Sequence, residues 1–228
     1  MEITWFGDTC IRLKGREGVV VADAYRSVVG PTGRGLTGDI CTYSHSDSSE
    51  PPRGKSKAAA ANHNGTGILR PASLEPAFYL DAPGEYEVHD VLITGVRTFR
   101  DENKGADRGL NTAFVMELDG LHAVHLGDVG HLLTEEALAE LGAVDVVCVS
   151  IGSSLSATKA AELVAQLDAN LVVPMPVGQD EAHASAELNR FLHEMGVQQA
   201  QPVSKLSVSI STVPHETTVV VLEARGRV

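Results

Sequence analysis

The chain has 228 residues, of which 43% are hydrophobic and 21% charged, and its net charge is −12 at pH 7. This length and hydrophobic content are typical of one soluble globular domain with a large core. The acidic balance argues against a nucleic-acid-binding surface, which needs clustered Lys and Arg. No apolar run approaches the roughly 20 residues that cross a bilayer. We therefore expect a protein that binds neither nucleic acid nor membranes.

The cysteines and the N-terminus indicate where the protein works. Cys10, Cys41 and Cys148 lie far apart and form no CxxC pair, which is typical of a reducing compartment. The first ten residues, MEITWFGDTC, lack a basic region followed by an apolar run, so no signal peptide is evident. We expect a cytoplasmic protein.

The first half of the chain reads as a series of short strands. Tight turns of the Gly-Asp and Gly-Arg-Glu-Gly type separate apolar or alternating runs. From Ser44 to about Ser73 the composition changes to Ser, Pro, Lys, Ala, Gly and Asn, which predicts a flexible insertion at about residues 50–72. The predicted strands lie at residues 2–6, 10–14, 18–23, 40–43, 78–80, 85–88 and 91–96.

The second half changes from hairpins to alternating helices and strands. Asp119-Gly120 is a two-residue turn signal between predicted strands at 111–118 and 121–126. Thr134 predicts the start of a helix that ends near Gly142. The later predicted elements are a strand at 145–149, a helix starting at Ser156, a strand at 171–173, an amphipathic helix that carries Leu188, Phe191, Leu192 and Met195 and ends at Gly196, and strands at about 205–210 and 217–223. Hairpins followed by β-α-β units predict an α/β protein with two sheets packed face to face.

The segment HLGDVGH, residues 125–131, carries the clearest chemical signal. It follows a predicted strand and offers an acid, Asp128, between His125 and His131. An acid between two imidazoles at a strand's end is what a metal ion or a hydrolytic water needs. The chain contains no Gly-x-Ser-x-Gly elbow and no phosphate-binding Gly-rich loop.

Six segments, in order, resemble the metallo-β-lactamase-fold hydrolases. They are ITWFGDTCIRL, APGEYEVHDVLITGVRTFRD, GLNTAFVMELDGLHAVHLGDVGHLL, DVVCVSIG, LVVPMP and KLSVSISTVPHETTVVVLE. Within that superfamily the closest resemblance is to the L-ascorbate-6-phosphate lactonase-like branch. It implies a four-layer αββα sandwich formed by one domain, residues 1–228, with a metal site at one edge between the sheets.

The resemblance also implies a set of metal ligands. The family carries a His-x-His-x-Asp-His loop, and the corresponding loop here, residues 42–50, reads TYSHSDSSE. One register places His45 at the first His, Asp47 at the second and Glu50 at the last. A two-residue shift instead places His45 and Asp47 at the second His and the Asp. Asp128 matches the family's bridging Asp, so the implied ligands are His45, Asp47, Glu50 and Asp128, with Asp128 also catalytic.

Several family positions carry other residues. The early Gly-His is Gly7-Asp8 here, the Tyr-His-Asp is Phe99-Arg100-Asp101, and the Pro-Met-His is Pro174-Met175-Pro176. We therefore do not expect a dinuclear zinc centre. If the carboxylates of Asp8, Asp47, Glu50, Asp101 and Asp128 converge, they suit one divalent ion, Mn²⁺ or Mg²⁺, with Zn²⁺ left open.

Arg100 suggests that a side-chain cation, and not a metal ion, occupies the same site. Arginine binds carboxylates through two donors and keeps its proton. We therefore expect Arg100 to enter the site as a fixed cation in the space of a metal ion.

Two functions follow from the resemblance and these departures. In the first, the metal site is largely eroded, and the protein is weakly catalytic or non-catalytic and binds a small-molecule ligand or a partner chain. In the second, it is a metal-dependent hydrolase of a small ester, lactone or phosphorylated substrate with an atypical carboxylate-rich site. Either is compatible with a homo-oligomer.

Overall fold

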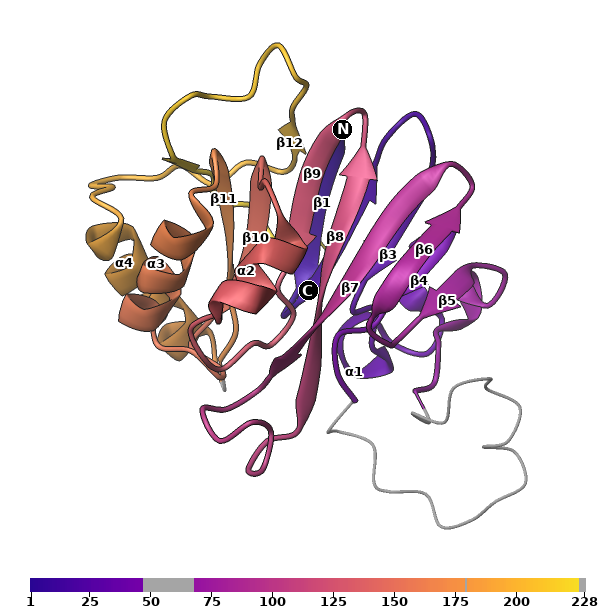
Figure 1. The fold of residues 1–228 in the computed structure, drawn as a ribbon, viewed down its shortest axis with the longest axis horizontal. Coiled ribbons are helices and arrows are strands. Elements are labelled where there is room, and N and C mark those ends of the chain that lie inside the picture. The colour runs from indigo at the N-terminus through magenta and orange to yellow at the C-terminus, as the bar shows by residue number, and fades with distance from the viewer. Residues whose placement is uncertain (47–67, 179, 226–228) are drawn as a thin grey trace.

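Two sheets packed face to face form the body of the protein (Figure 1), which confirms the predicted α/β sandwich. A computed structural model describes residues 1–46, 68–178 and 180–225. Within them the first sheet has the strand order β12-β1-β2-β3-β4-β5 and the second β13-β11-β10-β9-β8-β7-β6. The strands of the first sheet are β1 (Glu2–Gly7), β2 (Cys10–Lys14), β3 (Val19–Ala22), β4 (Ile40–Thr42), β5 (Phe78–Leu80) and β12 (Leu206–Ser207).

The second sheet combines the predicted hairpins with the predicted β-α-β units. Its hairpin strands pair antiparallel, whereas β9, β10, β11 and β13 are parallel neighbours. Its strands are β6 (Gly84–Val88), β7 (Val91–Phe99), β8 (Leu110–Leu118), β9 (Leu121–His125), β10 (Val146–Ile151), β11 (Leu171–Pro176) and β13 (Thr218–Val219).

Helices cover the outer face of the second sheet (Figure 1). They are α2 (Glu135–Leu141), α3 (Ala157–Leu167) and α4 (Glu181–Glu194). As predicted, Thr134 and Ser156 cap α2 and α3, because their side chains accept hydrogen bonds from first-turn backbone N–H groups. Over the first sheet the described helices are short: α1 (Arg26–Val29) and 3₁₀ turns at Gly33–Gly35 and Ala72–Leu74.

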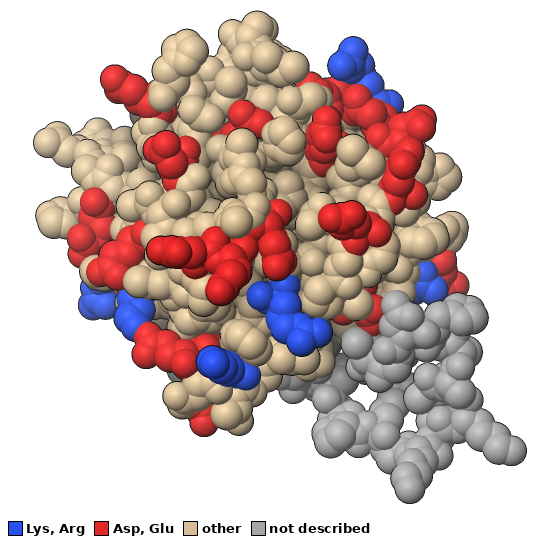
Figure 2. All heavy atoms as spheres, in the orientation of Figure 1, with Lys and Arg blue, Asp and Glu red and all other residues tan. Residues whose placement is uncertain are grey.

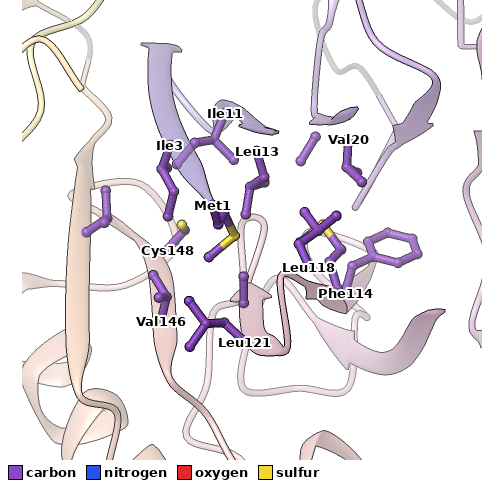
Figure 3. Packing of buried hydrophobic residues seen from close by; sticks show 14 of the residues in the cluster. Met1, Ile3, Ile11, Leu13, Val20, Phe114, Leu118, Leu121, Val146 and Cys148 are labelled. Atoms are coloured by element: carbon purple, nitrogen blue, oxygen red, sulfur yellow. The ribbon is translucent and has the colours of Figure 1, made fainter. Parts of the chain in front are cut away.

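The main core lies between the two sheets. Figure 3 shows Ile3, Ile11 and Leu13 of the first sheet packed toward Phe114 and Val146 of the second. All five are buried, because alternate residues of each strand face the opposite sheet. Cys148 is buried in the same core. This packing holds the strand ends, and therefore the loops that follow them, in a fixed relation.

The C-terminal elements differ from the prediction. The strand expected at about 205–210 shortens to β12, because the N–H groups of Thr212 and Val213 both donate to Ser209 and turn the chain there. The strand expected at 217–223 shortens to β13. The last helix starts at Glu181, because the Asp180 side chain accepts a hydrogen bond from His183 N and caps it. The predicted insertion at about 50–72 lies largely outside the described residues, which resume at the buried Ile68.

Among its charged residues the chain has 30 Asp and Glu against 18 Lys and Arg. Figure 2 shows Asp and Glu side chains spread over the visible face, with fewer Lys and Arg, as the net charge of −12 requires. No helix in the described ranges is both long and apolar enough to span a membrane.

Candidate functional site

The candidate site lies at the edge of the sandwich where β3, β4, β7 and β9 end (lower edge of Figure 1, beside the loop that joins β7 and β8). Asp23 follows β3, and Ser44 and His45 follow its parallel neighbour β4. Arg100 follows β7 and Asp128 follows β9, in the other sheet. A hydrogen bond from Thr112 N to Ser44 O, 2.7 Å long, joins the two sheets at this edge.

Arg100 and Asp128 form a largely buried ion pair at the centre of the site. Nε and Nη2 of Arg100 lie 2.9 and 2.8 Å from the same oxygen, Oδ2 of Asp128. The side chains are 12% and 4% exposed, respectively. Arg100 therefore enters the site as predicted, and it binds the carboxylate through two charge-assisted hydrogen bonds.

The remaining bonds of Asp128 are also made within its surroundings. Its Oδ1 accepts from Ser154 N at 3.3 Å, and Nη2 of Arg108 lies 3.7 Å from Oδ2. Its backbone N–H donates to Oδ1 of the buried Asn111 at 3.0 Å. Both carboxylate oxygens are thus engaged by protein donors.

Asp101 does not join Asp128 in an oxygen-rich cluster. Its carboxylate accepts four backbone hydrogen bonds from its own loop, from Asn103, Gly105, Asp107 and Arg108. Desolvation acts to raise the pKa of Asp101, but these four donors outweigh it and lower the pKa. Asp101 therefore shapes the loop that carries Arg108 toward Asp128.

His45 is held by a hydrogen-bonded chain that begins at Asp23. Ser44 Oγ lies 2.6 Å from Oδ2 of the buried Asp23 and 2.8 Å from Nδ1 of His45. A hydroxyl has one proton to donate, and the carboxylate takes it. Nδ1 of His45 must then donate to Ser44, so that in the neutral ring Nε2 is the acceptor.

Burial disfavours the charged form of that imidazole. Desolvation is the largest influence and lowers the pKa of His45, and the nearby charge of Arg100 lowers it further, against the opposing charges of Asp23 and Asp128. Arg100 and Arg108 supply positive charge beside Asp128.

The two histidines that flank Asp128 in the sequence contact backbone. His125 is buried, and its Nε2 lies 2.8 Å from Thr9 O. His131 accepts from Phe99 N through Nε2, and its Nδ1 lies 2.7 Å from Leu132 O. Both ring nitrogens of His131 are therefore occupied, and its role is to fasten the Asp128 loop to the end of β7.

A sequence profile described as the β-lactamase superfamily domain matches residues 2–176. The chain belongs to the metallo-β-lactamase superfamily. The superfamily match runs from β1 to the end of β11, so it includes Asp23, His45, Arg100 and Asp128.

Solved structures of the superfamily are similar over most of the chain. A protein from Thermotoga maritima, proposed to be a Zn-dependent hydrolase of the metallo-β-lactamase superfamily, is 28% identical with a TM-score of 0.69, and 97% of each chain is covered. A metallo hydrolase from Ignicoccus hospitalis is 16% identical with a TM-score of 0.58, covering 91% of this chain and 99% of that one. An isothiocyanate hydrolase from Delia radicum gut bacteria is 14% identical with a TM-score of 0.60, covering 92% and 100%. A search of curated proteins found no match.

The described residues do not fit the metal centre that membership of the metallo-β-lactamase superfamily implies. No group of three or more His, Cys, Asp and Glu among them is placed to hold a metal ion. The carboxylate of Asp128 already accepts hydrogen bonds from Arg100 and Ser154. The Arg100 guanidinium, 2.8–2.9 Å from Asp128 Oδ2, would repel a divalent cation bound there. The predicted ligands Asp47 and Glu50 lie outside the described residues.

Three residues of the site were missed by the sequence interpretation. Asp23 carries the signal of an acid directly after the apolar run Val19–Ala22, which could have been noticed. Asn111 and Arg108 carry no local signal, because their roles depend on contacts with Asp128, 17 and 20 residues along the chain.

Proposed function

We propose that this member of the metallo-β-lactamase superfamily is a metal-independent binding protein with little or no hydrolase activity. The observation that carries the proposal is the ion pair between Arg100 and Asp128, with both Arg100 donors on one oxygen at 2.8–2.9 Å. The family's bridging carboxylate is thereby neutralised by a protein cation that cannot lose its proton.

Electrostatics supports the same proposal. A divalent ion at Asp128 would have to displace Arg100 and leave a guanidinium that is 12% exposed without its partner. Removing one partner of a buried ion pair costs about 3–5 kcal/mol. Metal binding here would therefore start from a penalty that an open ligand set does not carry.

One comparison favours a second candidate function, a metal-dependent hydrolase of a small ester, lactone or phosphorylated substrate. The Thermotoga maritima protein, at 28% identity over 97% of both chains, is proposed to be a Zn-dependent hydrolase. This alternative is the function expected of the L-ascorbate-6-phosphate lactonase-like branch. One divalent ion would be held by His45, Asp47, Glu50 and Asp128.

Metal analysis separates the two candidates. The protein is purified without chelator, its metals are measured by mass spectrometry, and its melting temperature is followed with Mn²⁺, Mg²⁺ and Zn²⁺. We expect no stoichiometric bound ion. The added metals should shift the melting temperature by the same small amount in wild type, in Asp128→Ala and in the remote control Glu140→Gln. One ion per chain that is lost only in Asp128→Ala would contradict the proposal and support the hydrolase.

The proposal extends to where and with what the protein acts. Cys10, Cys41 and Cys148 are free and buried, which supports a reducing cytoplasm. The acidic surface supports a small-molecule ligand over nucleic acid or an anionic membrane. A homo-oligomer remains compatible, and gel filtration with light scattering tests it.

A further inference from the structure

A cavity of about 410 Å³ opens beside the ion pair. It shares Ser44, His45 and Asn111 with the site described above, and Asn111 accepts the backbone N–H of Asp128. Its volume lies within the range of about 300–1,000 Å³ that small-molecule sites occupy. The cavity is therefore large enough for a small organic ligand.

Much of the wall of this cavity is apolar. Tyr43, Ile68, Pro83 and Leu110 line it. Leu110 is 62% exposed, and among the large hydrophobic side chains of the described residues only Ile210 is more exposed. Covering such a side chain with an apolar ligand group is favourable, because it removes hydrocarbon surface from water.

Arg97 supplies the cation of the cavity. It lies on β7 opposite Thr112 of β8, and its side chain is exposed at the rim. Arg100 and Arg108 both lie within ion-pair distance of Asp128, whereas no ion pair or hydrogen bond of the Arg97 side chain is found within the described ranges. An arginine with its donors unused beside an apolar wall is a recognition element for a carboxylate.

The other titratable groups of the cavity leave Arg97 as the anchor. Nδ1 of His45, which also lines the cavity, is hydrogen-bonded to Ser44 Oγ. Asp81 also lines the cavity, and its Oδ2 lies 2.9 Å from the Tyr79 hydroxyl, which donates to it. A ligand anion would keep away from Asp81 and toward Arg97.

We propose that this cavity binds a small organic acid, with its carboxylate on Arg97 and its apolar body against Leu110 and Ile68. The proposal rests on the proposed function in one respect, namely that no metal ion takes part in binding. The two requirements, one negative charge and one apolar body, can be tested separately.

Three probes separate these requirements: 3-phenylpropionate, its uncharged amide 3-phenylpropionamide, and acetate, which lacks the apolar body. Binding to the full chain is followed by NMR chemical-shift titration. We expect saturable binding of 3-phenylpropionate, with about tenfold weaker binding of the amide and of acetate, because each lacks one of the two interactions.

Two variants test the named residues. Arg97→Gln should lower the affinity for 3-phenylpropionate about tenfold, since it removes the positive charge alone. The affinity for the amide should not change. Leu110→Ser should lower the affinity for both 3-phenylpropionate and its amide. Arg16→Gln, an equally conservative change of an exposed arginine beside Asp119, is the matched control and should leave the affinity for every probe unchanged. All three positions are exposed, so the variants should fold.

The outcomes that overturn the proposal are distinct from those that overturn the proposed function. Equal binding of acid and amide, no effect of Arg97→Gln, or no saturation by 3-phenylpropionate up to its solubility each overturns the organic-acid site. Every titration is repeated with EDTA. Binding that is abolished by EDTA contradicts the metal-independent function. Binding that persists in EDTA but has the same affinity in Arg97→Gln contradicts only this inference.

Discussion

Gly130 lies directly against the backbone of Arg100. A Cβ atom at position 130 would overlap the Arg100 carbonyl group and lie 2.7 Å from Asp101 N, a separation that Cβ atoms do not adopt. The backbone N–H of Gly130 also donates to Phe99 O at 2.8 Å. Glycine at this position therefore lets the loop after Asp128 approach the end of β7, which sets the distance between the two partners of the ion pair.

Gly130→Ala should destabilise the protein by about 2–3 kcal/mol, because the new methyl group meets backbone that cannot rotate away. Urea unfolding measures this change. Gly18→Ala is the matched control, since its Cβ would meet its neighbours at ordinary contact distances of 3.4 and 3.5 Å. Equal stability losses in the two variants would contradict the close approach at Gly130.

Arg100→Met should cost about 3–5 kcal/mol of folding free energy, because it leaves the carboxylate of Asp128 buried without its partner. Arg108, 3.7 Å away, offsets part of the loss. Denaturant unfolding provides the measurement, with Arg16→Met as the control for an exposed ion pair, which is worth little.

A double variant checks that the loss comes from the unpaired charge. Arg100→Met combined with Asp128→Asn should recover part of the stability, since no buried carboxylate then remains. A double variant that is less stable than Arg100→Met by the full cost of Asp128→Asn would show that the two residues are not coupled.

Asn111→Ala should cost about 2–4 kcal/mol, because three buried groups lose their partner at once. The Asn111 amide bonds Asp128 N at 3.0 Å, Thr98 Oγ1 at 2.7 Å and Leu126 O at 2.9 Å. Hydrogen exchange of the Asp128 amide should accelerate in this variant. Asn103→Ala, in an exposed loop, is the control, and equal exchange of Asp128 N–H in both variants would argue against the role of Asn111.

The loop that carries Arg108 should loosen at acid pH. The backbone N–H donors lower the pKa of Asp101, so the unfolded chain takes up the proton first as the pH falls. The stability that Asp101 contributes is therefore present above its ordinary pKa of about 3.9 and is lost as the pH falls through the lower folded value.

Asp101→Asn isolates this contribution from that of other carboxylates. The stability difference between wild type and Asp101→Asn should be largest at neutral pH and shrink as the solution is acidified. Unfolding curves over the acid range measure it, and Glu140→Gln, an exposed residue of α2, serves as the control. A difference that does not vary with pH would rule out the carboxylate as the loop's organiser.

Local patterns in the sequence predicted most of the strands and helices. Asp119 and Gly120 adopt the positive φ values of 55° and 73° that their two-residue hairpin turn requires, and Thr134 and Ser156 cap the helices expected after them. Elements whose ends depend on distant partners were harder to predict. The alternating residues 205–210 form only β12, since the turn at Ser209 and the length of β1 decide where pairing ends.

The sequence by itself determined the sandwich, its family and the identity of the residues at the site's edge, because period, turn and cap signals act over a few residues. It also indicated that an arginine stands where the family carries a histidine. Only the tertiary structure decided what that arginine does. The pairing of Arg100 with Asp128, 28 residues away, depends on the strand order β9-β8-β7 of the second sheet, which brings the ends of β7 and β9 to the same edge. The bonds of Asp101 depend on the path of the loop that follows it.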